Sequence, residues 1–474
     1  AGSIELKGRD GEASTETLGT VTVFGGAASQ LRSTPGTGGS AELTVNDVLR
    51  GGRGAVVFFT GDGSFKANFP SLTGDIIGIG VIGNNWATVS ATNQIVGYAD
   101  YELSGNPADW NSKNVKIVGP VSATDSRTIN SLNLAAAETL TINANERLTI
   151  TTGGVLASAN ATITGGAIGG DQSTDKELLV VVNGSSNTLT VGSVIDNVGT
   201  QGLTKAGDGT LKLTAAANTY SSTTNIYGGF VEIDTFAQLG TATSAIVLNG
   251  GGLRAAADIN PSTPRTAFAG VDGATLDTNG FELRLGAISG PGSVTKIGSG
   301  TLHLNGSNSF KGDFNLLAGT ASVVGTSGSF FENETYLNVA AGATFLVNDN
   351  GEDFGGISGA GNINTGVNST TNLDFYGTRT TEFSGVISGA GNVRNRAAGT
   401  LTLSGANTYT GSTAVMAGKL RVMNTVGSAT GTGPVSVSAG ATLEGIGSID
   451  GALTVAGTLD AGDGTTTGTL TINN

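Results

Sequence analysis

Hydrophobic and polar residues alternate along most of the chain, in runs of three to five residues. Clear examples of this alternation are Leu132/Leu134, Leu140/Ile142, Leu189/Val191, Val435/Val437 and Leu453/Val455. Because successive side chains of a strand point to opposite faces, each run predicts a short, half-buried β-strand. Gly, Asn or Ala-Gly separates the runs, and residues 115–137 show no sustained helical stripe. The pattern predicts an all-β protein with a turn after nearly every strand.

One sequence motif within this pattern occurs three times, which indicates an internal repeat. Its copies read GTLKL at Gly209–Leu213, GTLHL at Gly300–Leu304 and GTLTL at Gly399–Leu403. Turns that contain Asn218, Asn308 and Asn407 follow the copies, and a third matching segment comes next at residues 225–233, 315–323 and 414–422. We expect these three Asn side chains to point inward, bond to backbone groups of adjacent coils and pin the turn.

Short repeated strands cannot bury an apolar face alone, so they must stack on neighbouring copies. A sandwich or a barrel would not repeat its elements as near-identical phrases. With about 20–25 residues per coil and about 4.8 Å between coils, the chain would form about 20 coils. We therefore predict a single-stranded right-handed parallel β-helix, a solenoid in the form of an elongated rod.

The regularity of the pattern divides the chain near residue 120. Residues 1–120 are less regular and hold an aromatic cluster, with an excursion from short-strand stacking at Gly83–Pro107. We expect residues 1–120 to form an N-terminal β-rich module with an aromatic loop excursion, continuous with the helix. Residues 121–474 are expected to form a parallel β-helix of degenerate repeats.

Composition narrows the class of protein. Gly contributes 78 of 474 residues but Pro only 8, which does not fit collagen, and 38% hydrophobic residues do not fit disorder. The net charge is −14 with only 13% charged residues, so we expect no nucleic-acid partner. There is no Cys, which excludes thiol chemistry and Cys-based metal sites. No run approaches about 18 apolar residues, so we expect no membrane insertion by this chain.

Four aromatic residues of the N-terminal module form a candidate binding site. Trp86, Tyr98, Tyr101 and Trp110 could stack on the rings of a glycan if their side chains are exposed. Aromatic side chains of a β structure more often pack in the core. Glycan stacking and core packing are therefore both open for these four residues.

Other candidate chemistry is weaker. The single His, His303, alternates with two leucines and occupies the position of Lys212 and Thr402 in the other copies, so we expect an outward, solvated side chain. The carboxylates of Asp349 and Asp353 could bind calcium in a turn, but a solvated turn is the favoured reading. Acidic residues are scattered, whereas a glycosidase or lyase needs them clustered. We expect no catalytic residue, no cofactor and no metal, and hence no enzyme.

Two segments resemble the autotransporter-associated β-strand repeat family. These are residues 203–213 (LTKAGDGTLKL) and residues 399–418 (GTLTLSGANTYTGSTAVMAG), whereas the middle copy departs from the family pattern at Ser309-Phe310-Lys311. The resemblance implies a passenger-type region of a secreted bacterial repeat protein. It also implies an extracellular or outer cell surface location on a Gram-negative-type bacterium.

The first functional hypothesis is a non-enzymatic surface rod, an adhesin-like passenger or stalk that meets a surface glycan or a host or abiotic surface. The second is a subunit of an extracellular filament or matrix, a homo-oligomer formed by end-to-end stacking. It rests on Ser3–Lys7 and Leu470–Ile472, which have the pattern of strands rather than polar caps. A polysaccharide-active enzyme is the third and least favoured hypothesis. Whether the chain is a fragment or a complete processed subunit is left open.

Overall fold

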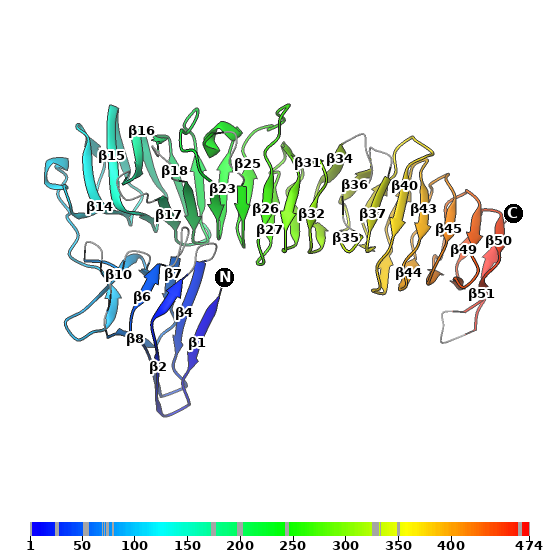
Figure 1. Ribbon diagram of the computed structural model, residues 1–474, viewed down its shortest axis with the longest axis horizontal. Helices are drawn as coiled ribbons and strands as arrows, with labels where there is room; N and C mark the ends of the chain where they lie inside the picture. The colour runs from blue at the N-terminus through cyan, green and yellow to red at the C-terminus, as the bar shows by residue number, and fades with distance from the viewer. Residues whose placement is uncertain are drawn as a thin grey trace. The chain divides into compact units, whose positions relative to one another are not determined.

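The protein is a parallel β-solenoid of about 18 turns (Figure 1). The computed structural model describes residues 2–23, 28–50, 56–68, 70, 72, 75–77, 80–171, 177–196, 202–241, 246–324, 331, 333–347, 351–462 and 467–473. The chain divides into two compact units, Ala1–Arg254 and Ala255–Asn474, which are treated separately below. The prediction of an all-β parallel solenoid is confirmed, while its handedness and the division near residue 120 stay predictions.

The described residues of the first unit contain β-strands and two 3-10 helices, η1 (Pro107–Asp109) and η3 (Phe236–Leu239). Its strands are β1 (Ser3–Lys7), β2 (Ala13–Leu18), β3 (Val21–Val23), β4 (Ala28–Thr34), β5 (Ser40–Val45), β6 (Val48–Arg50), β7 (Val56–Thr60), β8 (Ser64–Ala67), β9 (Gly80–Ile82), β10 (Asn85–Val89), β11 (Ile95–Gly97), β12 (Asn114–Ile117), β13 (Val121–Ala123), β14 (Arg127–Leu134), β15 (Thr139–Ala157), β16 (Ala161–Gly170), β17 (Leu178–Val182), β18 (Thr188–Val191), β19 (Val194–Ile195), β20 (Leu203–Ala206), β21 (Thr210–Leu213), β22 (Thr224–Ile226), β23 (Phe230–Ile233), β24 (Ile246–Leu248) and, at the boundary, β25 (Gly252–Ala255).

The second unit is built from strands alone among its described residues. They are β26 (Ala267–Ala269), β27 (Ala274–Asp277), β28 (Glu282–Leu285), β29 (Ile288–Gly290), β30 (Val294–Ile297), β31 (Thr301–Asn305), β32 (Ser309–Phe310), β33 (Phe314–Leu316), β34 (Thr320–Val324), β35 (Tyr336–Val339), β36 (Thr344–Val347), β37 (Gly351–Phe354), β38 (Gly356–Gly359), β39 (Asn362–Asn364), β40 (Asn372–Phe375), β41 (Thr381–Phe383), β42 (Val386–Ser388), β43 (Asn392–Asn395), β44 (Thr400–Leu403), β45 (Thr413–Val415), β46 (Lys419–Val422), β47 (Val435–Val437), β48 (Thr442–Gly445), β49 (Ser448–Ile449), β50 (Leu453–Val455), β51 (Thr458–Asp460) and β52 (Thr471–Ile472).

Alternation and register together build the core of the second unit. Strands β28, β31, β34, β36, β39 and β42 pair in parallel, one per coil. One fully buried side chain from each strand stacks on the next: Leu283, Leu302, Ala321, Phe345, Ile363 and Ile387. Burying a large apolar side chain contributes about 1.5–3 kcal/mol, so each coil becomes stable only when its neighbours cover it.

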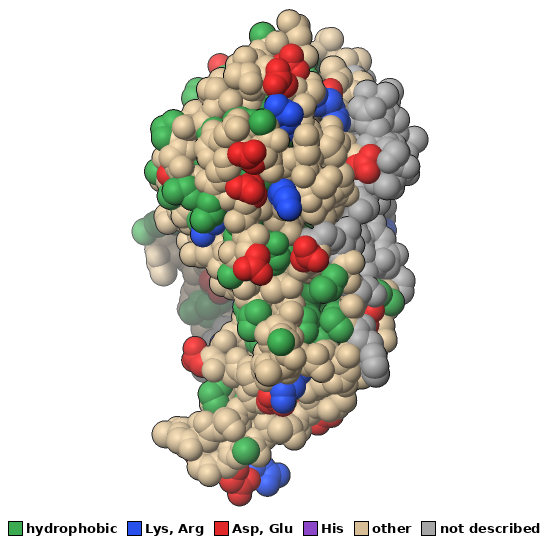
Figure 2. All heavy atoms as spheres, turned by 90° about the vertical axis from the view of Figure 1, so that its left-hand side faces the viewer, with side chains coloured by type: hydrophobic (Ala, Val, Ile, Leu, Met, Phe, Trp, Pro, Cys, Tyr) green, Lys and Arg blue, Asp and Glu red, His purple; other side chains and the backbone are tan. Residues whose placement is uncertain are grey.

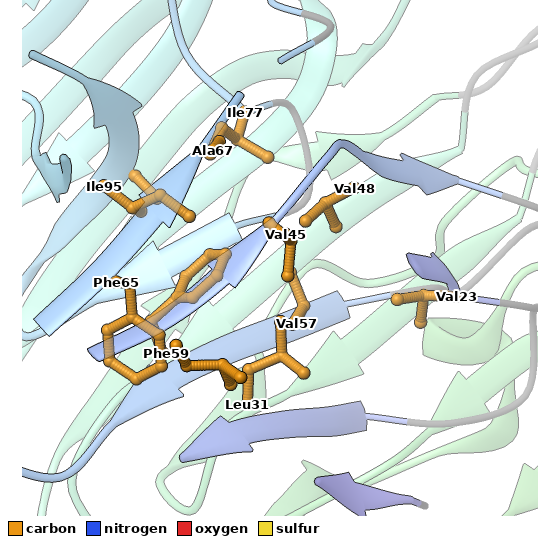
Figure 3. Close-up of a cluster of buried hydrophobic side chains, with 12 residues drawn as sticks. Val23, Leu31, Val45, Val48, Val57, Phe59, Phe65, Ala67, Ile77 and Ile95 are labelled. Carbon is orange, nitrogen blue, oxygen red and sulfur yellow. The ribbon is translucent and has the colours of Figure 1, made fainter. Parts of the chain in front are cut away.

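The first part of the chain also stacks parallel strands, around its own core. Strands β1, β4, β7 and β9 pair in parallel, as do β2, β5 and β8. Phe59 and Phe65 meet edge to face at 5.4 Å between ring centroids, with Leu31 and Val57 in the same cluster (Figure 3). Strand β10 is an exception because it pairs antiparallel with both β9 and β11. Strands β10 and β11 lie within the segment Gly83–Pro107, whereas β9 precedes it.

Candidate functional site

The aromatic residues of the candidate glycan site are buried in the first unit. Trp86 and Trp110 have 0% of their surface exposed, Tyr101 has 8% and Tyr98 has 9%. Their burial agrees with the packing alternative and leaves no open ring face for a sugar. Glycan stacking on these four residues stays an untested prediction that this geometry does not favour.

Trp86 joins the N-terminal strands to the flank of the later coils. It shares a buried cluster with Leu156 of β15 and Leu179 of β17. Its indole Nε1 donates to the carbonyl of Leu132 at 3.4 Å. A Cβ atom built on Gly154 would lie 2.7 Å from the indole, so the absence of a side chain at Gly154 makes room for the ring. We refer to this arrangement as the flank contact.

Polar bonds surround the flank contact. The Tyr101 hydroxyl accepts from the backbone N–H of Trp86 at 3.1 Å and from the side-chain amide of Asn133 at 3.0 Å. At another side, the Asn183 amide donates to the carbonyl of Gly83 at 3.0 Å. Burial raises the pKa of the Tyr101 hydroxyl, which keeps this group neutral and able to bond as observed. The contact is therefore held both by apolar burial and by hydrogen bonds.

Strand β17 is the strand whose sequence signals this contact most directly. Its five residues, Leu178–Val182, are all apolar and all buried. A strand with one solvent face alternates, whereas a run of apolar residues indicates cover on both faces. The outward Leu179 and Val181 are the residues that the N-terminal strands cover. This continuous apolar run, unlike the alternating strands, was not among the predicted features.

The three repeat Asn residues point inward and bond to neighbouring coils, as expected from the sequence. The Oδ1 atom of Asn218 accepts from the N–H of Ile195 at 2.7 Å, and its Nδ2 atom donates to the Gln238 carbonyl at 2.6 Å. These two partners belong to the coils before and after Asn218. Asn218 therefore links three successive coils of the solenoid by hydrogen bonds.

The other two copies repeat this bond with one difference. Asn407 accepts from the N–H of Ile387 at 2.7 Å and donates to the carbonyl of Ala429 at 2.6 Å. Asn308 accepts from the N–H of Ile288 at 2.9 Å, but it donates to Gly306 in its own turn at 3.2 Å. Asn308 therefore links two coils by hydrogen bonds, whereas Asn407 links three.

A buried amine occupies a second equivalent position, four residues before the repeated Gly-Thr-Leu. Lys205 has 0% exposure, and its Nζ atom donates to the carbonyls of Gly207 at 2.7 Å, Ala206 at 2.9 Å and Gly228 at 3.0 Å. Burial lowers the pKa of this amine to about 7, while the charge of Asp208 acts in the opposite direction. Lys205 thus links a turn in its own coil to a turn in the next.

The same inner link recurs in the other copies with different chemistry. Lys296 donates to the carbonyl of Ala318 at 2.8 Å, and Asn395 donates to that of Ala417 at 3.2 Å. Burial lowers the pKa of Lys296 to about 8, and Asp277 acts in the opposite direction. These residues were not among the predicted site residues, although the alternation around Lys296 places it on the inward face.

The tyrosine of the repeat turn has a partner that changes with it. The Tyr220 hydroxyl lies 2.8 Å from the Thr224 hydroxyl, and Tyr409 repeats the contact with Thr413. The middle copy has Phe310 at the tyrosine position and an apolar residue, Phe314, at the threonine position. Their rings meet edge to face at 6.3 Å. The departure of the middle copy from the repeat pattern therefore changes a polar pair into an apolar one.

His303 lies on the outward face of β31, although its side chain is only 18% exposed. Its Nε2 atom is 3.9 Å from a carboxylate oxygen of Glu282. Burial lowers the His303 pKa and the Arg284 charge adds to this, whereas Glu282 opposes it. The imidazole is therefore neutral at pH 7.

Two carboxylates on the outward faces of the second unit are neutralised by cations. Asp374 is 3% exposed and binds the guanidinium groups of Arg394 and Arg396. Glu444 is 1% exposed and lies between Lys419 and Arg421. These acids have structural partners and differ from the free paired carboxylates of a glycosidase.

Only one of the two candidate calcium ligands lies among the described residues. Asp353 is on β37, but Asp349 lies outside the described residues. In the parts of the chain that the structure describes, no group of three or more His, Cys, Asp or Glu residues is arranged to hold a metal. Within the same residues, no helix has the length and hydropathy needed to cross a membrane.

Charge is thinly spread over the surface. Figure 2 shows one face of the molecule, on which acidic and basic side chains are scattered between larger areas of uncharged polar side chains and backbone. This distribution fits the 13% content of charged residues. It offers no extended single-sign field on that face that would steer a polyelectrolyte.

Comparison with known proteins identifies the repeats. Residues 203–233, 294–320 and 398–422 match the passenger-associated-transport-repeat, and these segments contain the three repeated phrases. Three segments of the β-solenoid are therefore similar to the passenger-associated-transport-repeat.

A relative of known class is the adhesin BmaC autotransporter of Brucella suis biovar 1 (strain 1330). The two proteins are 30% identical over 472 residues, which cover 88% of this chain and 13% of the relative. The chain thus spans about one eighth of the length of this relative. No solved structure matches the chain.

Proposed function

We propose that this chain is part of the passenger of an autotransporter adhesin, carried on the outer surface of a Gram-negative bacterium. The observation that carries the proposal is the similarity to an autotransporter adhesin over 88% of the chain. The three passenger repeats and the β-solenoid support it independently. In this role the chain attaches the cell to a second surface and holds its contact faces away from the cell.

The proposed role is non-enzymatic. Asp374 and Glu444, two outward acids of the second unit, are closed off by basic partners. The repeated positions carry structural bonds, such as those of Asn407, rather than exposed reactive groups. Incubation of the purified chain with neutral and acidic polysaccharides, with and without Ca²⁺, tests this part. Release of reducing ends would contradict it.

Adhesion is tested by displaying the chain on a bacterium that does not adhere by itself. Cells that display residues 1–474 should be retained on host-cell, glycan-coated or abiotic surfaces more than cells that display an unrelated solenoid of similar length. Treatment with an external protease should remove both the displayed chain and the retention. Equal retention of the two strains on every surface would contradict the proposed function.

Location in the native organism needs a separate measurement. Antibodies against this chain should label intact cells or the culture medium and not require permeabilised cells. The distribution between these two fractions distinguishes a cell-bound passenger from a released one. End-to-end stacking stays a prediction from the sequence, and electron microscopy of the chain at high concentration would test it.

A further inference from the structure

One face of the second unit carries a ladder of uncharged polar side chains. Its members lie in register on five successive paired strands, β27, β30, β33, β35 and β38. They are Thr275, Thr295, Asn315, Asn338 and Ser358. All five are partly exposed. For each of them, the preceding residue of the strand is buried. We call this set the polar ladder.

The polar ladder differs from other ladders because its side chains have no hydrogen-bond partner among the described residues. On β40 and β43, by contrast, Asn392 donates to Asn372 at 3.2 Å and accepts from Ser412 at 2.9 Å. That second ladder satisfies its own polar groups along the solenoid. The polar ladder instead directs unused donors and acceptors outward at one level after another.

The two sides of the polar ladder are also suited to a ligand. Leu317, two residues after Asn315, is an apolar side chain with 45% exposure. Tyr336, two residues before Asn338, carries the guanidinium of Arg379 at 4.0 Å from its ring centroid. The Arg379 side chain is 59% exposed, and Asp313 neutralises its charge through bonds of 3.0 and 3.2 Å. The ladder thus lies between the apolar side chain of Leu317 and the guanidinium of Arg379, which covers the Tyr336 ring and is neutralised by Asp313.

The chemistry of the ladder changes at the following strand. The pairing of Gly359 with Phe383 places Glu382 of β41 next to Ser358. Thr402, Arg421 and Glu444 then continue the same register on the next strands. The uncharged, unpartnered surface therefore has a defined end where charged residues begin.

We propose that the polar ladder binds an uncharged, extended polysaccharide whose sugar units follow the solenoid axis. Sugar hydroxyls both donate and accept hydrogen bonds, which matches Thr, Asn and Ser side chains. The apolar faces of sugar rings match Leu317. Neighbouring strands are about 4.8 Å apart, which is close to the advance per unit of an extended β-1,4-linked pyranose chain. One sugar therefore meets one coil.

The absence of net charge selects the class of polysaccharide. An acidic polymer would find no unpaired cation along the ladder, because Arg379 is bound to Asp313. Each exposed hydrogen bond contributes little, so affinity comes from several coils that bind one chain together. This inference deepens the proposed adhesive function and rests on it for its biological meaning, but the binding itself can be measured independently.

The test is sedimentation of the purified 474-residue chain with insoluble cellulose and chitin, and affinity electrophoresis in soluble neutral glucans and in alginate. The variant Asn315→Ala/Asn338→Ala removes two polar side chains of the ladder, and Asn338→Lys places a charge on the ladder. Ser436→Ala/Thr454→Ala is the matched control, because these residues lie in register on β47 and β50, outside the ladder. Urea unfolding of every variant verifies that the fold is retained.

The expected result is binding to a neutral β-linked polysaccharide that changes little with salt, since no ion pair forms. The affinity of both ladder variants should be lower by about tenfold or more, and the control should bind as the parent does. Absence of binding to every neutral polymer, binding to alginate alone, or equal loss in the control would overturn the proposal. So would a ladder-dependent affinity for a protein-coated surface without affinity for sugars.

The display experiment separates this inference from the proposed function. Cells that adhere equally with the parent and the Asn315→Ala/Asn338→Ala chain would remove the ladder as the adhesive face and leave the adhesin proposal in place. Cells that do not adhere at all, combined with a purified chain that sediments with cellulose, would remove adhesion and leave polysaccharide binding.

Discussion

The hydroxyl of Tyr409 lies 2.6 Å from Oγ1 of Thr413, four residues later in the chain, and both groups are buried. The equivalent residues of the middle copy are Phe310 and Phe314, which have no hydroxyl to pair. The two positions therefore change together between copies. Burial of the tyrosine hydroxyl without the threonine would leave it without this partner, which costs about 1–3 kcal/mol, whereas the Thr413 hydroxyl also donates to the Thr430 carbonyl at 3.3 Å.

This relationship predicts strong coupling in a double-mutant cycle. Thr413→Val should lower the free energy of unfolding by about 1–3 kcal/mol, because the Tyr409 hydroxyl and the Thr430 carbonyl each lose a partner. In a Tyr409→Phe background the same change should cost less, with a coupling energy of about 1 kcal/mol or more. Urea unfolding of the four proteins measures it. Additive effects would show that the contact contributes little.

The reverse change should harm the middle copy. Phe310→Tyr adds a hydroxyl at a site that is 1% exposed and lies against the ring of Phe314. The expected cost is about 1–3 kcal/mol in the free energy of unfolding, from desolvation of the added group. Phe310→Leu, which adds no polar atom, serves as the comparison. A stability of Phe310→Tyr equal to the parent would contradict this account of the exchange.

Lys205 predicts a particular dependence of stability on pH. Its pKa is about 7 in the folded chain and about 10.4 in the unfolded chain. Between these values the unfolded chain binds a proton that the folded chain lacks, so the free energy of unfolding rises with pH. Below about pH 7 both states are protonated and the contribution becomes constant. Lys296 should act in the same direction above about pH 8.

The measurement is urea unfolding of the parent and of Lys205→Met at pH 7 and at pH 9.5. The parent should gain at least about 1 kcal/mol relative to the variant over this interval, the value of a single pKa unit. Lys212→Met is the control, because the Lys212 side chain is 41% exposed and pairs with Glu232 at the surface. An identical pH response in the parent and Lys205→Met would refute the prediction.

Gly154 predicts that the flank contact can be opened by one side chain. A Val at this position would overlap the Trp86 ring, since even a Cβ atom would lie 2.7 Å from it. In Gly154→Val we expect red-shifted Trp86 fluorescence, measured in a Trp110→Phe background, and faster proteolysis of residues 2–97. Gly19→Ala is the control, because its Cβ atom would have nothing within 4 Å. Unchanged fluorescence in Gly154→Val would contradict the contact.

The repeat Asn residues predict an order of stability. Asn407→Ala leaves the N–H of Ile387 and the carbonyl of Ala429 without their partner, whereas Asn308→Ala breaks one bond to a neighbouring coil. Each buried group that loses its bond costs about 1–3 kcal/mol. Asn407→Ala should therefore lower the unfolding midpoint more than Asn308→Ala does. The opposite order would show that coil-to-coil bonding does not govern the effect.

The strands and the repeat were predictable because their causes are local. The alternation of Leu302, His303 and Leu304 follows directly from the pleat, and the inward direction of Asn407 follows from its place in a repeated turn. The stacking of coils then follows from the need to cover each apolar face. Only the number of coils differed slightly, about 18 in the structure against about 20 expected.

The flank contact was not predictable in the same way. Trp86 and Gly154 are far apart in sequence, and a contact between them leaves no periodic pattern in either segment. The all-apolar β17 gave a signal that one more surface was covered, but not which segment covered it. The polar ladder is similar, because Thr and Asn at outward positions are ordinary. Only the register shows that five of them lie in line and lack partners.

The inner link of Lys205 has a consequence for how this protein can be divided. One of the three carbonyls that accept from Lys205, that of Gly228, belongs to the following coil. The side-chain amide of Asn218 likewise donates to the carbonyl of Gln238 in the following coil. A segment cut at the borders of one repeated motif would retain a buried amine that has lost one of its three acceptors, or a buried amide that has lost the acceptor of its Nδ2 atom. Shortened versions should therefore end one full coil beyond the last repeat they are meant to preserve.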